Sequence, residues 1–274
     1  MYKLIACDMD ETLLNDQREI SPKTVAAIKK ASQAGVYFVP NTGRNFLTIQ
    51  DNLETLDLVQ KPDQYVISFN GATIVENKDL RVVDVQAMPY DVVKQLFEIG
   101  LKAGVCIHVY TVSTLYMWNV NQGEIDYLAG RVDGWEEPTQ QDIAFLKDEP
   151  ITKIIFNIDE EAKRHEMHAY VEEHVKTPLN ITYSSDRYIE FNDPTADKGQ
   201  AVVRLGEILG IKPSEIIAIG DNGNDLSMIK AAGLGVCVAN GRDFVKQEAN
   251  YVTSADNNHD AIAEVINKFI FNEE

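Results

Sequence analysis

The stretch that most constrains the fold is residues 3–12, an apolar run that ends in two carboxylates separated by one residue. Its sequence is KLIACDMDET, so Asp8 and Asp10 directly follow the apolar residues. A buried parallel strand reads as a short, continuous apolar run, and in open α/β sheets ligands bind beyond the carboxyl ends of such strands. We therefore expect Asp8 and Asp10 to stand at the ligand-binding edge of a parallel sheet.

The spacing of the two carboxylates indicates what they could bind. Residues two apart on an extended segment point the same way, so both carboxylates share a small volume and repel each other unless a cation or a shared proton intervenes. A Mg²⁺ ion held by one or two carboxylates and a substrate phosphate would remove this conflict. An acidic turn at a strand end, where Asp is an ordinary residue, explains the same pattern without a ligand.

Composition excludes several classes of protein. The chain has 274 residues, of which 45% are hydrophobic and 25% charged, which is typical of a globular protein with two domains. A formal charge of −18 argues against nucleic acid and anionic membranes as partners. No apolar run approaches the roughly 20 residues of a membrane span, and no basic leader precedes a long apolar region. We expect a cytoplasmic protein whose three cysteines, Cys7, Cys106 and Cys237, are small buried hydrophobes.

A strand, a helix and a second strand follow one another at the start of the chain. Ser21 suits a helix N-cap and Pro22 the first helical position, and Gly35 ends the helix. Residues 36–39 form the second strand, and this order predicts a parallel crossover. The strand leads into Pro40-Asn41-Thr42-Gly43-Arg44 and an amphipathic segment over residues 45–56.

Thr42 and Gly43 would lie at the N-terminus of the helix over residues 45–56, where free backbone N–H groups favour an anion. A plain turn explains Thr-Gly-Arg equally well. The next segments are a third strand over residues 65–69, which ends in Asn70-Gly71-Ala72, and a hairpin over residues 72–85 that turns at Asn77-Lys78.

The pattern changes between residues 85 and 192, where strands adjoin in hairpins instead of alternating with helices. This indicates an inserted α+β domain, which we interpret as a cap. Its predicted elements are helices over residues 89–104 and 160–175 and strands over residues 105–110, 115–119, 151–158 and 181–191, the last divided at Ser185-Asp186. Four polar-tipped side chains on these strands are candidates for contacts to a substrate, although each is also an ordinary sheet residue: Tyr110, Trp118, His108 and Arg187.

The alternating pattern then resumes. A helix opens at Lys198-Gly199 and ends at Gly210, and a strand over residues 216–219 runs into Gly220-Asp221-Asn222-Gly223-Asn224-Asp225. A helix to Ala232, a strand over residues 235–238 and a helix from about Asp260 complete the chain. We predict an α/β fold: a Rossmann-like parallel-sheet core with helices on both faces, built from residues 1–84 and 193–274, and an α+β cap inserted at residues 85–192.

Two basic residues stand where the helix dipole disfavours them. Lys198 lies in the first turn of its helix and Arg44 at the start of another, which costs a few tenths of a kcal/mol unless an anion meets them. A solvated surface charge explains either one alone. Because both follow strand ends in an acidic protein, we expect them to meet one anionic ligand, a phosphate that Thr42, Gly43 and Asn224 also surround.

Asp221 and Asp225 supply the opposite charge. If the strand over residues 216–219 lies next to the first strand, both carboxylates can approach Asp8 and the backbone carbonyl of Asp10. The result would be an oxygen-only site suited to Mg²⁺. An acidic turn without an ion is the alternative.

The ordered set of motifs resembles the haloacid dehalogenase superfamily, in the Cof-type sugar-phosphatase branch with a large α+β cap. The resemblance covers essentially the whole chain and rests on five motifs in the family's order: Asp8-x-Asp10-x-Thr12, Thr42-Gly43-Arg44, Asn70-Gly71-Ala72, Lys198-Gly199 and Gly220-Asp221-x-x-Asn224-Asp225.

The resemblance implies a role for each matching residue. Asp8 would attack phosphorus and form an aspartyl-phosphate, and Asp10 would protonate the leaving alcohol and later activate water. The Mg²⁺ ligands would be Asp8, Asp10 through its carbonyl, and Asp221, supported by Asn222 or Asp225. The phosphoryl oxygens would be held by Thr42, Gly43, Lys198, Asn224 and the backbone N–H of Met9.

The resemblance therefore implies a Mg²⁺-dependent phosphatase that acts on small phosphate monoesters such as sugar phosphates. A phosphomutase with the same nucleophile and a non-catalytic binding or regulatory protein are the alternatives. Three departures from the family pattern stand out: Glu11 replaces a usual Gly, Pro40-Asn41 replaces small residues, and Asn257-Asn258-His259-Asp260 stands where a Gly-containing turn is more usual. We expect these three departures to alter the rate or the selectivity of the reaction without abolishing activity.

Overall fold

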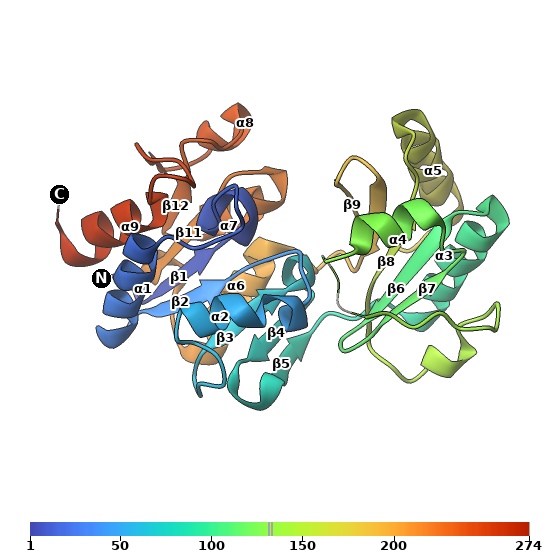
Figure 1. Cartoon of the computed structure of the whole chain (residues 1–274), viewed down its shortest axis with the longest axis horizontal. Helices are drawn as coiled ribbons and strands as arrows, with labels where there is room; N and C mark the ends of the chain where they lie inside the picture. Colours follow the sequence, from blue (N-terminus) through green and yellow to red (C-terminus); the bar gives the residue numbers. More distant parts are fainter. Residues whose placement is uncertain (131, 133, 274) are drawn as a thin grey trace. The chain divides into compact units, whose positions relative to one another are not determined.

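The computed structural model describes residues 1–130, 132 and 134–273 and divides the chain into two compact units. The core unit combines residues 1–84 with the segment from Asp197 onward, and the inserted unit is Val85–Ala196. Figure 1 shows each unit with its own sheet and helices. The assignment of these units to a catalytic core and a cap stays a prediction.

A parallel sheet of five strands organises the core unit. Its order is β13-β12-β11-β1-β2, and β1 (Leu4–Cys7) lies between β2, the next strand along the chain, and the sequence-distant β11. The register pairs Cys7 with Ile219 on one side and with Pro40 on the other. The remaining strands are β2 (Tyr37–Pro40), β11 (Ile216–Gly220), β12 (Leu234–Cys237) and β13 (Tyr251–Val252). The predicted parallel sheet is thus confirmed, and the two Asp-bearing strands are neighbours.

Helices cover this sheet because alternate strand residues point to opposite faces. Leu4 and Ala6 pack with Val202 of α6 and Met228 of α7, whereas α1 and α9 lie beside each other in Figure 1. Ser21 caps α1 by accepting the N–H of Thr24, as its sequence predicts. The core helices are α1 (Pro22–Gln33), α2 (Gln50–Thr55), α6 (Lys198–Leu209), α7 (Leu226–Ala231), α8 (Asp243–Lys246) and α9 (Ala261–Ile266).

The segment after β2 is helical where the sequence predicts it, but the helix begins beyond Thr42 and Gly43. A 3₁₀ helix over Phe46–Ile49, capped by the side chain of Asn45, precedes α2, so no helix begins at Thr42 and Gly43. The N–H of Thr42 instead donates to the carbonyl of Ile67 at 2.9 Å. The Thr42 N–H is therefore paired with a neighbouring strand instead of being a free donor at a helix N-terminus, and the binding of phosphate by Thr42 and Gly43 stays a prediction.

That neighbouring strand belongs to a small separate sheet. β3 (Tyr65–Ser68), β4 (Thr73–Glu76) and β5 (Arg81–Val85) form a three-stranded sheet in that order, which confirms the predicted hairpin. A single parallel bridge between Asn41 and Ile67 links it to the end of β2. The third strand thus brings its own end close to the ends of β1 and β2.

The inserted unit is an antiparallel sheet with the order β7-β6-β8-β10-β9, as the hairpin pattern predicts. One face packs on α3 and α5 around an apolar core, in which the ring of Trp118 lies 4.7 Å from that of Phe97. The elements are α3 (Tyr90–Ala103), β6 (Cys106–Thr111), β7 (Leu115–Trp118), α4 (Gln122–Leu128), β8 (Ile151–Asn157), α5 (Glu161–His174), β9 (Asn180–Ser184) and β10 (Tyr188–Asn192).

Helix α4 was not expected from the sequence, and a buried carboxylate attaches it to the sheet. Glu124 is fully buried, accepts a hydrogen bond from the Tyr188 hydroxyl and lies 3.0 Å from the guanidinium of Arg187 and 3.2 Å from His108. Two of the candidate side chains, His108 and Arg187, thus belong to a polar cluster inside this unit. Trp118 is part of the apolar core.

Among the described residues, no helix has both the length and the apolar character needed to cross a bilayer. All three cysteines are free and buried, as predicted.

Gly199 tests how tightly α6 and α7 pack. A Cβ atom there would lie 2.4 Å from the backbone carbonyl of Ser227. Gly199→Ala should therefore push the two helices apart and lower the free energy of unfolding by about 1–3 kcal/mol, measured by denaturant titration. Glu207→Ala, at an exposed site on the same helix, is the control and should change it by less than about 0.5 kcal/mol. An equal change in the free energy of unfolding for the two variants would contradict the close packing of α6 on α7.

Candidate active site

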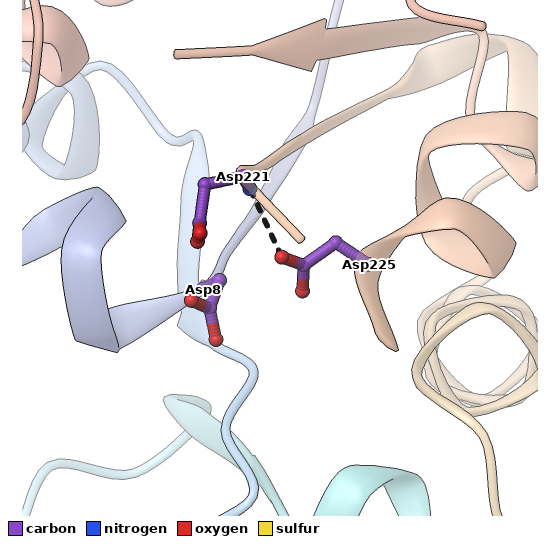
Figure 2. A group of neighbouring side chains, drawn as sticks. All are labelled: Asp8, Asp221 and Asp225. Atoms are coloured by element: carbon purple, nitrogen blue, oxygen red, sulfur yellow. Dashed lines mark hydrogen bonds between the residues drawn. The ribbon is translucent and has the colours of Figure 1, made fainter. Parts of the chain in front are cut away.

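Three buried carboxylates meet at the carboxyl ends of β1 and β11. Asp8 follows β1, Asp221 follows β11, and Asp225 ends the short turn after Asp221. One oxygen from each lies within 4.8 Å of the others. Figure 2 shows the three side chains gathered between the strand ends, with the carboxylate of Asp225 directed to the backbone of Asp221. The strand pairing therefore brings Asp8 close to Asp221 and Asp225, which lie more than 200 positions later in the chain.

Asp225 is held on both oxygens. Its Oδ2 accepts the N–H groups of Asp221 and Asn222, each at 3.0 Å, and its Oδ1 accepts from Lys198 Nζ at 2.6 Å. Gly220 permits this approach, since a Cβ there would lie 2.4 Å from the Cβ of Asp225. Asp225 therefore shapes the turn that carries Asp221 and fixes the lysine.

Lys198 is the cation at the centre of the cluster. Its side chain is fully buried, and Nζ donates to both Asp8 Oδ1 and Asp225 Oδ1. Burial alone would lower the pKa of Lys198, but the carboxylates of Asp225 and Asp8 outweigh it and raise the pKa. The ammonium group therefore stays charged. Its contacts with the two carboxylates offset the unfavourable interaction of a positive charge with the N-terminal end of the α6 dipole.

The surroundings of Asp221 and Asp8 disfavour the charged form of each carboxylate. Burial, followed by the charge of Asp225, raises the pKa of Asp221 to about 6, although Thr12 Oγ1 donates to its Oδ1 at 2.8 Å. Burial and Asp225 also raise the pKa of Asp8 well above its ordinary value, despite the contact with Lys198. One ammonium group thus does not compensate three carboxylates.

The donor set fits a hard divalent cation. Three carboxylates and one ammonium leave a local charge of about −2, and the cluster offers only oxygen atoms, the ligands that Mg²⁺ prefers. Asp8 and Asp221 have oxygens to offer, whereas those of Asp225 already accept hydrogen bonds from Lys198 and two backbone N–H groups. Asn222 is exposed, and its side chain accepts the N–H of Gly223.

Asp10 lies outside this cluster of carboxylates and is paired with Arg44. Arg44 Nε donates to Asp10 Oδ2 at 2.8 Å, and Nη2 donates to Oδ1. The Asp10 side chain is 54% exposed and that of Arg44 20%. Arg44, predicted to hold phosphate, thus has one edge of its guanidinium on Asp10.

A second group of polar residues gathers where β2 and β3 end. Thr42 is buried, and its Oγ1 accepts the N–H of Arg44 at 3.1 Å, which leaves its own proton available to a ligand. A Cβ on Gly43 would lie 3.0 Å from Asn70 Oδ1, and the same oxygen accepts from Asn224 Nδ2 at 3.3 Å. Met9, in contrast, has a fully buried side chain, so only its backbone could face a ligand.

Sequence reasoning missed two residues of this region. Asn70 was noted only as part of a motif, yet it bridges the loops of Gly43 and Asn224 from a turn in which Phe69 and Asn70 both have positive φ, 52° and 54°. Asn41 was noted only as a departure, yet it is fully buried and donates from Nδ2 to the backbone carbonyl of Lys198 at 3.2 Å. The signal available in the sequence was the same for both: each asparagine lies just beyond the end of a predicted strand and stands in or next to one of the motifs, Thr42-Gly43-Arg44 or Asn70-Gly71-Ala72.

The chain is similar to known hydrolases over nearly its whole length. The profile described as haloacid dehalogenase-like hydrolase matches residues 5–266. "Putative phosphatase YxeH" of Bacillus subtilis is 34% identical, and the alignment covers 98% of this chain and 99% of that protein. "5-amino-6-(5-phospho-D-ribitylamino)uracil phosphatase YcsE" of the same species is 31% identical, with 98% and 96% covered. The crystal structure of TM0651 from Thermotoga maritima is 28% identical, with 98% of both chains covered and a TM-score of 0.85.

Glu11 tests the backbone strain beside the site. Its φ of 58° and ψ of 9° lie in the left-handed region, which glycine adopts freely and other residues at a cost of about 1–2 kcal/mol. Glu11→Gly should therefore raise the free energy of unfolding by about 1 kcal/mol, measured by denaturant titration. Glu11→Ala removes the charge and keeps the strain, so it should leave stability nearly unchanged. An equal rise in the free energy of unfolding for Glu11→Gly and Glu11→Ala would show that the gain comes from removing the carboxylate charge and not from relieving backbone strain.

Asp221 makes stability depend on pH. In the folded protein its pKa is about 6, above the value of about 4 in an unfolded chain, so the folded state binds the proton more tightly. The stabilising contribution is thus complete below about pH 4 and is lost as pH rises through about 6. In metal-free protein, Asp221→Asn should gain free energy of unfolding relative to the unmodified chain between about pH 4 and pH 7. Parallel pH profiles for the two proteins would contradict this.

The same variant tests the cation. At pH 7, Mg²⁺ at 100 times its dissociation constant should stabilise the unmodified chain by about 2.7 kcal/mol in thermal unfolding. Asp221→Asn should show a much smaller gain, and NaCl at matched ionic strength should stabilise neither. A Mg²⁺ effect that survives the substitution would place the ion elsewhere.

Proposed function

The chain belongs to the haloacid dehalogenase-like hydrolases and is a phosphatase, and from this premise we propose that it hydrolyses small phosphate monoesters with Mg²⁺ through an aspartyl-phosphate on Asp8. Sugar phosphates and related phosphorylated metabolites are the proposed substrates. A cytoplasmic location, which the sequence predicts, is part of this proposal.

One observation carries the proposal: the buried carboxylate of Asp8 accepts a hydrogen bond from the buried ammonium of Lys198 at the carboxyl ends of the parallel strands. The contact with Lys198 orients Asp8 and favours its anionic form, which is the form that attacks phosphorus. Because Lys198 is also fixed by Asp225, its position does not depend on Asp8. The geometry suits a nucleophile that must lose its charge on phosphorylation and regain it on hydrolysis.

In the first step, an oxygen of Asp8 forms a bond to phosphorus as the bond between phosphorus and the leaving oxygen breaks. Asp10 gives its proton to that leaving oxygen, which departs as an alcohol. Lys198, the hydroxyl of Thr42, the amide of Asn224 and the backbone N–H groups of Gly43 and Met9 are the proposed donors to the three phosphoryl oxygens.

In the second step, water attacks the phosphorus of the aspartyl-phosphate. Asp10, now a carboxylate, takes a proton from this water, and the bond between Asp8 and phosphorus breaks. Inorganic phosphate is released and Asp8 returns to its carboxylate form. The same residue therefore acts as acid and then as base.

Asp8, the carbonyl of Asp10 and Asp221 are the proposed ligands of Mg²⁺, with Asp225 and Asn222 in support. When bound, the ion would neutralise charge on the carboxylates and on the phosphoryl group. Thr12 keeps Asp221 oriented through its hydroxyl.

We propose that the inserted unit selects the organic part of the substrate, as the resemblance to a capped phosphatase implies, while the core unit supplies the phosphate chemistry. The name of YcsE, a relative at 31% identity, denotes a ribityl phosphate substrate of that protein. A polyol or sugar phosphate is therefore the first class of substrate to assay.

Substitution of Asp8 tests the nucleophile. Asp8→Asn should reduce release of inorganic phosphate at least about 1,000-fold on every substrate, because an amide does not attack phosphorus. Thermal unfolding checks that the variant is folded, and EDTA should abolish the activity of the unmodified chain. Turnover by Asp8→Asn near the unmodified rate would refute the assignment, and release that requires a bisphosphate activator would indicate a phosphomutase.

Substitution of Asp10 tests the acid. Asp10→Asn should lower kcat/KM about 100-fold or more for an alkyl phosphate and much less for p-nitrophenyl phosphate, whose leaving group needs little protonation. We compare kcat/KM because it reports the step in which the leaving group departs. Equal losses on the two substrates would count against Asp10 as the acid.

A further inference from the structure

The pair between Arg44 and Asp10 has a geometry that phosphate binding does not explain. Nε and Nη2 form one edge of the guanidinium, and both donate to Asp10, one N–H to each carboxylate oxygen. This arrangement is the planar, two-bond fork that arginine forms with a carboxylate and lysine does not. The same edge is therefore occupied by Asp10 rather than open to a phosphoryl oxygen.

The backbone of Arg44 is held on both sides of the side chain. Its N–H donates to Thr42 Oγ1 at 3.1 Å, and its carbonyl accepts from the N–H of Phe69 at 3.1 Å and from Ser68 Oγ at 2.5 Å. These contacts tie Arg44 to the end of β3. The guanidinium thus starts from a fixed point in the fold.

Among the residues that the structure describes, Arg44 alone donates hydrogen bonds to the carboxylate of Asp10. The Asp10 side chain is 54% exposed, and the residue after it, Glu11, has a left-handed backbone. A half-exposed carboxylate samples several rotamers, whereas proton transfer requires one oxygen within hydrogen-bond reach of the leaving group. Exposed ion pairs contribute little stability, so the fold gains little from this pair itself.

We propose that Arg44 is a positioning residue for Asp10: it holds the carboxyl group where it can protonate the leaving oxygen. The inference rests on the proposed function of Asp10 and gives Arg44 a different task from the phosphate binding that the sequence predicts. Each carboxylate oxygen has two lone pairs, so an oxygen that accepts an N–H from Arg44 retains one for the proton that it transfers. Arg44 itself neither gives nor takes a proton.

The test compares leaving groups in Arg44→Lys and Arg44→Gln. If Arg44 positions the acid, both variants should lower kcat/KM for an alkyl phosphate about 10-fold or more and for p-nitrophenyl phosphate less than about 3-fold. The inhibition constant of inorganic phosphate should stay within about 2-fold of the unmodified value, since the phosphate site keeps its donors. Lysine, which has charge without the fork, should not restore the alkyl activity.

A double-mutant cycle separates positioning from a general loss of structure. In the background of Asp10→Asn, Arg44→Gln should cause no further loss in kcat/KM for the alkyl phosphate, because the group that it positions is no longer an acid. Arg81→Lys is the matched control. Arg81 donates through Nε and Nη2 to Glu76, at 2.9 and 2.6 Å, within the same unit, and its substitution should leave both substrates unaffected.

The opposite results are distinct. Equal losses on both substrates, with a several-fold rise in the inhibition constant of phosphate, would overturn the proposal and make Arg44 a phosphate ligand. Additive losses in the Asp10→Asn background would also overturn it. If the unmodified chain releases no phosphate from any monoester, both the proposed function and this inference fail. If the unmodified chain is active but the Arg44 variants lose kcat/KM equally on the alkyl and the p-nitrophenyl phosphate, only the inference fails.

Discussion

Three carboxylates that share one buried lysine are the constraint on which the rest of the core unit depends. Asp8, Asp221 and Asp225 come from the ends of adjacent strands, and Lys198 from the start of α6 bonds to two of them. Burying like charges raises their pKa values, which is unfavourable for folding at neutral pH unless a cation compensates. Asp225 accepts two backbone N–H groups, Gly220 lets the side chain of Asp225 approach closely, and Gly199 does the same for the backbone of Ser227. The site is therefore built at a cost in stability that a divalent cation would offset.

Some of the chain's left-handed residues lie beside this site. Glu11 lies next to Asp10 in a left-handed conformation, and Phe69 and Asn70 form a left-handed turn at the end of β3. Such conformations persist where surrounding contacts over-determine them, and they are common at functional sites. Here the left-handed residues are Glu11, next to Asp10, and Asn70, whose amide oxygen accepts a hydrogen bond from Asn224. Asp260, with a φ of 66°, is another left-handed residue, in the C-terminal segment that departs from the family pattern.

Much of the fold was predictable because it depends on local pattern. The apolar run before Asp8, the cap at Ser21 and the glycine at position 210 define a strand and the ends of two helices, as observed. The pairing of β1 with β11 was only a condition of the predicted metal site, and the structure meets that condition. The elements that were missed depend on tertiary contacts: α4 is attached through the buried Glu124, and the backbone at Thr42 pairs with β3 instead of starting a helix. The pairing of Arg44 with Asp10 was equally invisible, because spacing along the chain does not reveal which anion an arginine meets.

The central claim is that Asp8 carries the phosphoryl group during turnover. The most direct measurement is a rapid acid quench of the Mg²⁺-loaded enzyme during turnover of a substrate labelled with ³²P at phosphorus, followed by peptide mass spectrometry. The account predicts label on the peptide that contains Asp8, released by hydroxylamine as expected of an acyl phosphate, and none in Asp8→Asn. Phosphate release without label on any peptide, at every quench time, would contradict the account and indicate direct attack by water.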